Sequence, residues 1–140
     1  MSRIFWDTNL FIYLIEGSGE RARRVTALRE RMLTRGDQLY TSTLTLGEIL
    51  VKPAEAGNVA LQQHYEETIG AGTVILPFDQ PAARAYATIR KDRSIRAPDA
   101  IQLACAVNAR IDLFITNDER LSQKVIPGLQ FIASLDKAFF

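Results

Sequence analysis

The segment IFWDTNLFIYLIE, residues 4–16, joins a short apolar run to a helical pattern through a single acidic residue. The run Ile4–Trp6 has no polar face, which is typical of a strand buried on both sides of a parallel sheet. Asp7 follows it directly, and a helix is predicted over Leu10–Glu16, ending at Gly17. This order predicts the first unit of an α/β fold, in which polar side chains collect beyond the carboxyl ends of the strands.

The same alternation continues along the chain. Further buried strands are predicted at Leu39–Thr43, Val74–Phe78, Leu113–Thr116 and Leu129–Ile132. Further helices are predicted at Glu20–Arg35, Thr45–Val51, Val59–Ile69, Pro81–Arg93, Pro98–Arg110 and Glu119–Val125. Together they predict a central parallel sheet of about five strands flanked by helices, a three-layer α/β sandwich. Because no repeat or linker interrupts the pattern, residues 1–140 are expected to form one domain.

The composition is that of an ordinary globular domain, with 140 residues, 47% of them apolar and 24% charged. Seventeen Lys and Arg against sixteen Asp and Glu give a net charge of +1, which identifies no partner. No apolar run approaches the roughly 20 residues of a membrane span, and the N-terminus lacks a secretion signal, so we expect a cytoplasmic protein that does not enter a membrane. Cys105 is the only cysteine and has apolar neighbours, which predicts a core position.

Four carboxylates come from four separate elements. Asp7 and Asp118 follow two predicted strands and therefore belong to the same edge of a parallel sheet. Glu48 is the only acid in the apolar and small-residue segment TSTLTLGEIL, and Asp99 lies in the first turn of the nearly all-apolar helix that begins at Pro98. Carboxylates gathered in one cleft repel one another unless a cation neutralises them. The ions that prefer such oxygen ligands are Mg²⁺ and Mn²⁺.

Three of these acids also have a purely structural interpretation. Asp7 could cap the helix at Leu10, Asp118 could cap the helix at Glu119, and Asp99 could favour the positive end of its helix dipole. Helix capping does not explain why Glu48 interrupts an apolar helix, nor why two acids follow strands at one edge of the sheet. The joint functional interpretation is therefore preferred.

The phrases IFWDTNLFIYLIE, TSTLTLGEIL, APDAIQLACA and FITND, in this order, resemble the PIN-domain ribonucleases. Their spacing and the chain length are most similar to those of the stand-alone VapC toxins of prokaryotic type II toxin-antitoxin pairs. The resemblance implies a PIN-like sandwich and an endoribonuclease that hydrolyses RNA phosphodiester bonds with Mg²⁺ or Mn²⁺. It also implies a VapB-like antitoxin, which lays a peptide over the cleft, and a homodimer.

The acids of this family fall on Asp7, Glu48, Asp99 and Asp118. We expect Asp7 and Asp99 to hold the principal ion, and Asp118 to complete its shell or bridge to a second ion. Glu48 is expected to orient a water or act as the base. Two polar positions that commonly support the first and last acids are matched by Asn9 and Thr116.

RNA binding also requires cations, because phosphates dominate its affinity. A basic group lies just upstream of Asp99 and is the better candidate: Arg90, Lys91, Arg93 and Arg96. A second group lies on the helix predicted at 20–35: Arg21, Arg23, Arg24 and Arg29. For each single arginine, a solvated surface position is the alternative.

Two other protein classes, a phosphatase and a signalling domain, fit this sequence poorly. A haloacid dehalogenase-type phosphatase needs a second Asp two residues after the first, where this chain has Asn9. A receiver domain could use only Asp79, but Pro81 favours a helix cap there. Two alternatives stay open: a PIN nuclease that processes RNA outside toxin-antitoxin pairs, and a catalytically silent PIN-like module that binds RNA or protein. Metal-dependent cleavage by the purified protein separates the silent module from the enzymes.

Overall fold

The structure is a computed structural model and describes residues 1–138. Its strands are β1 (Arg3–Trp6), β2 (Gln38–Ser42), β3 (Val74–Leu76), β4 (Leu113–Thr116) and β5 (Phe131–Ser134). Its helices are α1 (Thr8–Glu16), α2 (Gly19–Arg35), α3 (Thr43–Glu55), α4 (Val59–Gly72), α5 (Gln80–Ile89), α6 (Ala97–Asn108) and α7 (Glu119–Ser122), followed by the 3-10 turn η1 (Leu135–Lys137). No described helix has the length and apolar character needed to cross a membrane.

The strands form one parallel sheet in the order β3-β2-β1-β4-β5. The first strand is central, and the chain builds the sheet outward from it, first through β2 and β3 and then through β4 and β5. The strand order reverses between β1 and β4, and in open α/β sheets ligands bind beyond the carboxyl ends of the strands at this point. The predicted parallel α/β architecture is thus confirmed, and its expected binding edge follows β1 and β4.

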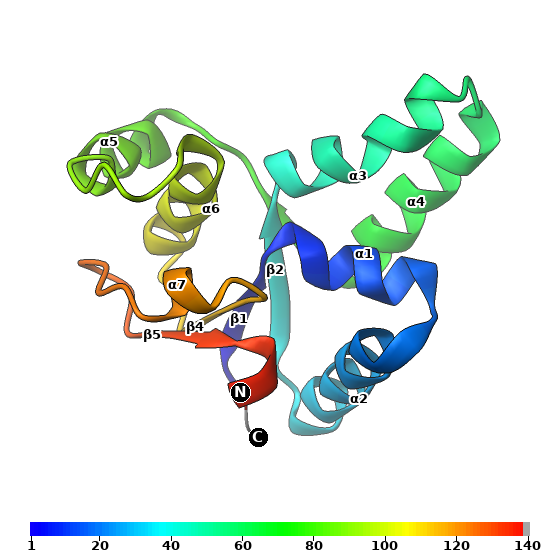
Figure 1. The fold of residues 1–140 in the computed structure, drawn as a ribbon, viewed down its shortest axis with the longest axis horizontal. Helices are drawn as coiled ribbons and strands as arrows, with labels where there is room; N and C mark the ends of the chain where they lie inside the picture. The colour runs from blue at the N-terminus through cyan, green and yellow to red at the C-terminus, as the bar shows by residue number, and fades with distance from the viewer. Residues whose placement is uncertain (139–140) are drawn as a thin grey trace.

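Alternate residues of the central strands build two cores. Phe5 stacks on Phe114, with ring centroids 4.9 Å apart, in the core that includes α5 and α6. Ile4 and Trp6 point to the other face and pack in the core that includes α1 and α2. Figure 1 shows these helix pairs on opposite sides of the sheet. The predicted three-layer sandwich is confirmed.

Helices α3 and α4 form a hairpin that extends away from the sheet (Figure 1). The side chain of Asn58 accepts a hydrogen bond from the Leu61 amide and so begins α4. Helix α3 is longer than predicted, because it continues through the buried Pro53 to Glu55. The hairpin nevertheless packs on the rest of the domain, because Ile49 of α3 and Ile69 of α4 are buried in the core that includes α1 and α2.

Several predicted boundaries were wrong, each for a local reason. Thr43 begins α3 instead of ending a strand, because Ser42 Oγ accepts from the Leu44 amide as a helix cap. The third strand stops at Leu76, since the following Pro77 has no amide hydrogen for the ladder. The last strand begins two residues late, because the Leu129 amide is used in a turn that closes on the Ile126 carbonyl. Helices α5, α6 and α7 also end before their predicted C-termini.

Candidate active site

Asp7 lies at the end of the central strand and is held from both sides. Its amide donates to the Ile115 carbonyl of β4 at 3.0 Å. One carboxylate oxygen, Oδ1, accepts from the Thr8 amide at 2.9 Å and caps α1. The other, Oδ2, accepts from the buried Thr116 hydroxyl at 2.9 Å. The Asp7 carboxylate therefore caps α1 with one oxygen and binds the predicted supporting residue Thr116 with the other.

Burial raises the pKa of Asp7 above its ordinary value, and the negative charge of Asp99 raises it further. The hydrogen bonds from Thr116, Thr8 and Gln102 act in the opposite direction and lower this pKa, but they do not cancel the effect of desolvation. The ionised carboxylate is therefore not fully stabilised by its neighbours. A cation near Asp7 and Asp99 would supply the missing stabilisation.

Three of the four predicted acids line one pocket of about 280 Å³: Asp7, Glu48 and Asp99. We call this the acidic pocket; Asn9 and Gln102 line it too. Asp118 does not line it. Asp118 lies in a smaller neighbouring pocket of about 90 Å³, which also has Asp99 in its wall. The structure thus places the fourth acid next to the acidic pocket rather than in it.

Asp99 and Asp118 each sit at a helix start. Asp99 is in the first turn of α6, and one of its oxygens lies 3.4 Å from the exposed Arg96 guanidinium. Asp118 Oδ1 accepts from the Arg120 and Leu121 amides and caps α7, as its structural interpretation predicts. The Asp118 amide in turn donates to Thr116 Oγ1 at 3.1 Å. Thr116 therefore links Asp118 to Asp7, because the same hydroxyl donates to Asp7 Oδ2.

Glu48 reaches the acidic pocket from α3 and is oriented by a residue of α1. The Thr8 hydroxyl donates to Glu48 Oε1 at 2.7 Å. Thr8 is itself buried, and its oxygen lies 3.1 Å from Thr45 Oγ1. Sequence reasoning identified Glu48 but missed Thr8, which directly follows Asp7.

Gln102 was also missed, although it is the polar centre of the site. It is buried in α6, and its Nε2 lies 2.6 Å from Thr45 Oγ1, 3.1 Å from Thr8 Oγ1 and 3.3 Å from Asp7 Oδ1. Its Oε1 accepts a short hydrogen bond from Ser42. The signal that could have found it is the one that singled out Glu48: a lone polar residue within an otherwise apolar helix.

The predicted basic group divides into different roles. Arg90 Nη1 donates to the Ile95 carbonyl at 2.6 Å and so braces its own loop. Arg96 lies beside Asp99, while Lys91 and Arg93 are exposed. Two cations that sequence reasoning did not single out line the smaller pocket with Asp99 and Asp118, namely Arg120 and Lys124. Lys124 Nζ is fixed by Asp92 and Ser94.

The donor set of the acidic pocket suits a hard divalent cation. Within residues 1–138, no three carboxylate, imidazole or thiol side chains stand close enough together to hold a metal ion as they are placed. The available donors are nevertheless all oxygens. Burial, and to a lesser extent the charge of Asp99, raises the pKa of Asp7, so a cation there would stabilise its ionised form. The residues therefore fit Mg²⁺ or Mn²⁺ by chemistry, with Asp7 and Asp99 as the first candidates.

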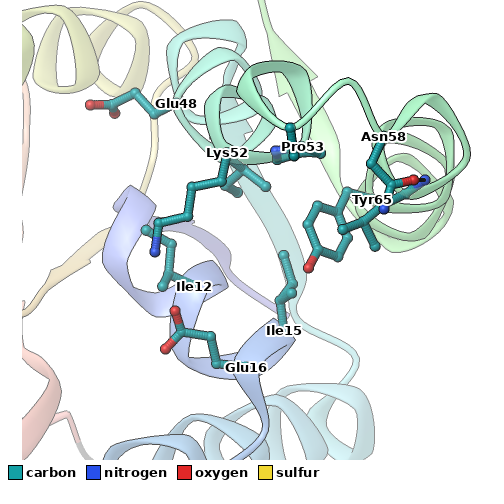
Figure 2. Close-up of a pocket in the computed structure, with 11 residues that line it drawn as sticks. Ile12, Ile15, Glu16, Glu48, Lys52, Pro53, Asn58 and Tyr65 are labelled. Atoms are coloured by element: carbon teal, nitrogen blue, oxygen red, sulfur yellow. Dashed lines mark hydrogen bonds between the residues drawn. The ribbon is translucent and has the colours of Figure 1, made fainter.

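A mostly apolar groove continues from the acidic pocket along α1. It has a volume of about 360 Å³, and Ile12 and Glu48 belong to both cavities. Figure 2 shows its walls: Ile12 and Ile15 come from α1, Lys52 from α3 and Tyr65 from α4. We call this cavity the α1 groove. A mostly apolar surface therefore extends up to Glu48, one of the carboxylates of the candidate site.

Comparison with known proteins identifies the domain. The PIN domain family model matches residues 4–126. Among curated proteins, none matches the chain.

Solved structures agree with this assignment. The fold is similar to VapBC2 from Rickettsia felis bound to a DNA fragment from their promoter, with a TM-score of 0.73, 15% identity, and coverage of 94% of this chain and 98% of that chain. It is also similar to DNA-bound VapBC from Salmonella typhimurium and to VapBC-1 from nontypeable Haemophilus influenzae. Each of these has a TM-score of 0.73, 22% identity, and coverage of 96% of this chain and 99% of that chain. The expected PIN-like fold and its likeness to VapC are confirmed.

Proposed function

The chain belongs to the PIN domain family, and on this basis we propose that it is a metal-dependent endoribonuclease, the toxin of a toxin-antitoxin pair, acting in the cytoplasm as a single domain over residues 1–140. The observation that supports the proposal most directly is the meeting of Asp7, Glu48 and Asp99 in one pocket at the carboxyl edge of the sheet. These residues come from β1, α3 and α6, so their convergence is a product of the whole fold.

In the proposed mechanism, Asp7 and Asp99 would hold Mg²⁺ or Mn²⁺, and Asp118 would contribute from the neighbouring pocket. When bound, the ion lowers the pKa of water and stabilises negative charge on the phosphate. Glu48 orients the attacking water and accepts its proton as the new P–O bond forms; the leaving oxygen takes a proton from solvent as its bond to phosphorus breaks. Thr8 fixes the orientation of the Glu48 carboxylate, because the Thr8 hydroxyl donates a hydrogen bond to Glu48 Oε1.

The supporting residues keep the two strand-end acids in register. Thr116 donates to Asp7 Oδ2 and accepts from the Asp118 amide, so one hydroxyl couples both acids. Asn9 lines the acidic pocket from the first turn of α1 and is assigned to contact ligands there. This arrangement positions the acids before any substrate arrives.

RNA is proposed to approach across the loop between α5 and α6. Lys91 and Arg93 are exposed there, and Arg96 stands beside Asp99. Lys124 lines the smaller pocket, and its Nζ donates to Asp92 and Ser94 of the same loop. Exposed cations around an acidic centre can bind the phosphates on either side of the cleaved bond without neutralising the centre itself. Arg90 is assigned to the loop rather than to RNA, because its guanidinium binds the Ile95 carbonyl.

The proposed partner is a VapB-like antitoxin. The structurally similar proteins from Rickettsia felis and Salmonella typhimurium are VapBC complexes bound to DNA. In this chain, a peptide bound in the mostly apolar α1 groove would have one end beside Glu48 (Figure 2). A basic peptide side chain at that end would meet the acids. A homodimer is also proposed, by likeness to the family.

Cleavage of a panel of structured RNAs tests the function. Wild-type protein should cleave with Mg²⁺ or Mn²⁺ and lose activity in EDTA, and Asp99→Asn should be inactive under all these conditions. Asp136→Asn is the matched control, because Asp136 is exposed and its carboxylate binds Arg24 on α2. No cleavage by folded wild-type protein would contradict the proposal and favour a binding module. Cleavage without a neighbouring antitoxin gene would instead favour an RNA-processing nuclease.

A further inference from the structure

A third cavity, of about 300 Å³, lies between α1, α2 and α4. Its walls are largely apolar and include Phe11, Leu14, Leu39 and Tyr65. Arg29 of α2 lines it as well, together with His64 and Thr68 of α4. We call this cavity the Arg29 pocket. Arg29 is the one guanidinium or ammonium group in this wall, and His64 adds an imidazole. Burial of a charge is costly unless a partner stabilises it.

Arg29 is incompletely satisfied. Its Nη2 donates to the Gly72 carbonyl at 3.2 Å, but its Nη1 is buried and meets no acceptor within the part of the chain that the structure describes. Burial lowers the pKa of the guanidinium, as expected for a cation partly removed from water. Arg23 and Arg24, on the same helix, lie near the carboxylate of Glu20. Within residues 1–138, the Arg29 guanidinium thus makes one hydrogen bond and no ion pair, so no carboxylate of these residues balances its positive charge.

The Arg29 pocket adjoins the α1 groove. Ile15 and Tyr65 belong to the walls of both cavities. The α1 groove in turn shares Ile12 and Glu48 with the acidic pocket. The three cavities therefore lie next to one another along α1. Carboxylates line the acidic pocket, aliphatic and aromatic side chains together with Glu16 and Lys52 line the α1 groove, and Arg29 lines the third cavity.

We propose that the Arg29 pocket receives an acidic side chain, Asp or Glu, of the peptide that occupies the α1 groove. The acidic residue follows an apolar residue that packs on Tyr65 and Ile15. A peptide bound in this way has a fixed direction, because its basic end faces Glu48 and its acidic end faces Arg29. This inference names the chemistry of the partner segment and rests on the proposed function only for the identity of that partner.

A carboxylate fits this cavity better than a phosphate group. A carboxylate carries one charge and pairs with a single guanidinium in a fork. A phosphate monoester carries about two charges at neutral pH and is bound best by several cations. Besides Arg29, this wall offers the imidazole of His64 among mostly apolar side chains such as Phe11, Leu14 and Leu39. The apolar path leading to the cavity suits a peptide whose neighbouring side chains are aliphatic.

The test uses two blocked tripeptides, acetyl-Leu-Leu-Glu-amide and its neutral counterpart acetyl-Leu-Leu-Gln-amide, titrated into ¹⁵N-labelled protein. We expect the acidic peptide to shift the amide signals of Arg29, Gly72 and Thr73, and to bind about fivefold more tightly than the neutral one. Arg29→Gln should abolish this difference, and Arg29→Lys should retain part of it. Arg31→Gln is the matched control, because Arg31 is exposed on the same helix.

Equal binding of the two peptides, or an undiminished preference in Arg29→Gln, would overturn the inference, as would shifts confined to other parts of the chain. The ¹⁵N spectrum of each variant also reports whether it is folded. RNA cleavage by wild-type protein is measured in parallel, as the separate test of the proposed function. An RNA assay that fails with wild-type protein contradicts the proposed function alone, whereas loss of peptide selectivity contradicts only this inference.

Discussion

Thr8 Oγ1 donates a 2.7 Å hydrogen bond to Glu48 Oε1 and so joins the first turn of α1 to the middle of α3. The residue that follows the central strand's acid therefore sets the direction of an acid 40 positions later. Because Thr8 is buried, water competes poorly for this hydrogen bond. The orientation of Glu48 is thus built into the fold.

Removing that hydroxyl should reduce cleavage without unfolding the protein. Thr8→Val keeps the shape of the side chain but frees Glu48, and we expect kcat for RNA cleavage to fall about 10- to 100-fold, the usual effect of losing such a supporting contact. Thr8→Ser should retain most of the activity. Thr26→Val, at an exposed position of α2, is the control. Full activity in Thr8→Val would show that Glu48 needs no orientation.

Gln102→Leu should destabilise the fold, because it leaves the buried hydroxyls of Ser42 and Thr45 without their amide partner. The expected loss is about 1–3 kcal/mol in the free energy of unfolding, measured with urea. Gln63→Leu changes the same residue type at an exposed site of α4 and should stay within about 0.5 kcal/mol of wild type. Equal effects of the two substitutions would argue against a polar centre at Gln102.

The sequence was sufficient for the architecture and for the edge where the acids meet. Strand-end positions identified Asp7 and Asp118, because strand direction is readable from local pattern and parallel strands share one edge. Glu48 and Asp99 were found because each is an acid in an apolar helix. Pattern alone did not show that Asp118 lies in a separate pocket, since that depends on the path of the two residues after β4.

The residues that sequence reasoning missed act through contacts between distant segments. Gln102 meets Asp7 and Thr8 across about 95 positions of the chain, and no local period reveals such a contact. The Arg29 pocket likewise needs α1, α2 and α4 to be assembled. The local pattern shows that Gln102 and Arg29 are polar residues on helices. Which residues surround them becomes visible only when the helices are packed together.

The stability of the metal-free protein should decrease as pH rises through the titration of Asp7. Burial raises the pKa of this carboxyl in the folded state, so the native protein retains its proton to higher pH than the unfolded chain does. The stabilising contribution of protonated Asp7 is complete below the unfolded pKa, about 4, and is lost as pH rises through the folded pKa.

Asp7→Asn tests this linkage. In EDTA, the variant should gain stability relative to wild type as the pH rises from about 4 to 7.5, measured by urea unfolding. Addition of Mg²⁺ at pH 7.5 should stabilise wild type more than the variant. A stability difference that is constant with pH would contradict the assigned burial of Asp7, and equal stabilisation by Mg²⁺ would remove Asp7 from the metal site.

Cys105 should be chemically inert in the folded protein. It is buried, as expected from its apolar neighbours, and burial raises the pKa of its thiol to about 11. At pH 8 only roughly one thiol in a thousand would be ionised, so iodoacetamide should label it slowly until urea unfolds the chain. The raised thiol pKa contributes stability that is complete below about pH 9 and is lost between about 9 and 11. Rapid labelling of folded protein at pH 8 would contradict this.

Asp7 and Asp118 are at once helix caps and candidate metal ligands. Loss of either carboxylate by substitution with Ala would therefore weaken a helix start as well as the chemistry, whereas Asn can still cap. Variants of this chain that survive as stable but silent proteins should accordingly carry Asn at these positions. If selection favours loss of activity, the simplest change is therefore Asp→Asn at one of these positions, which needs only one nucleotide substitution in the Asp codon.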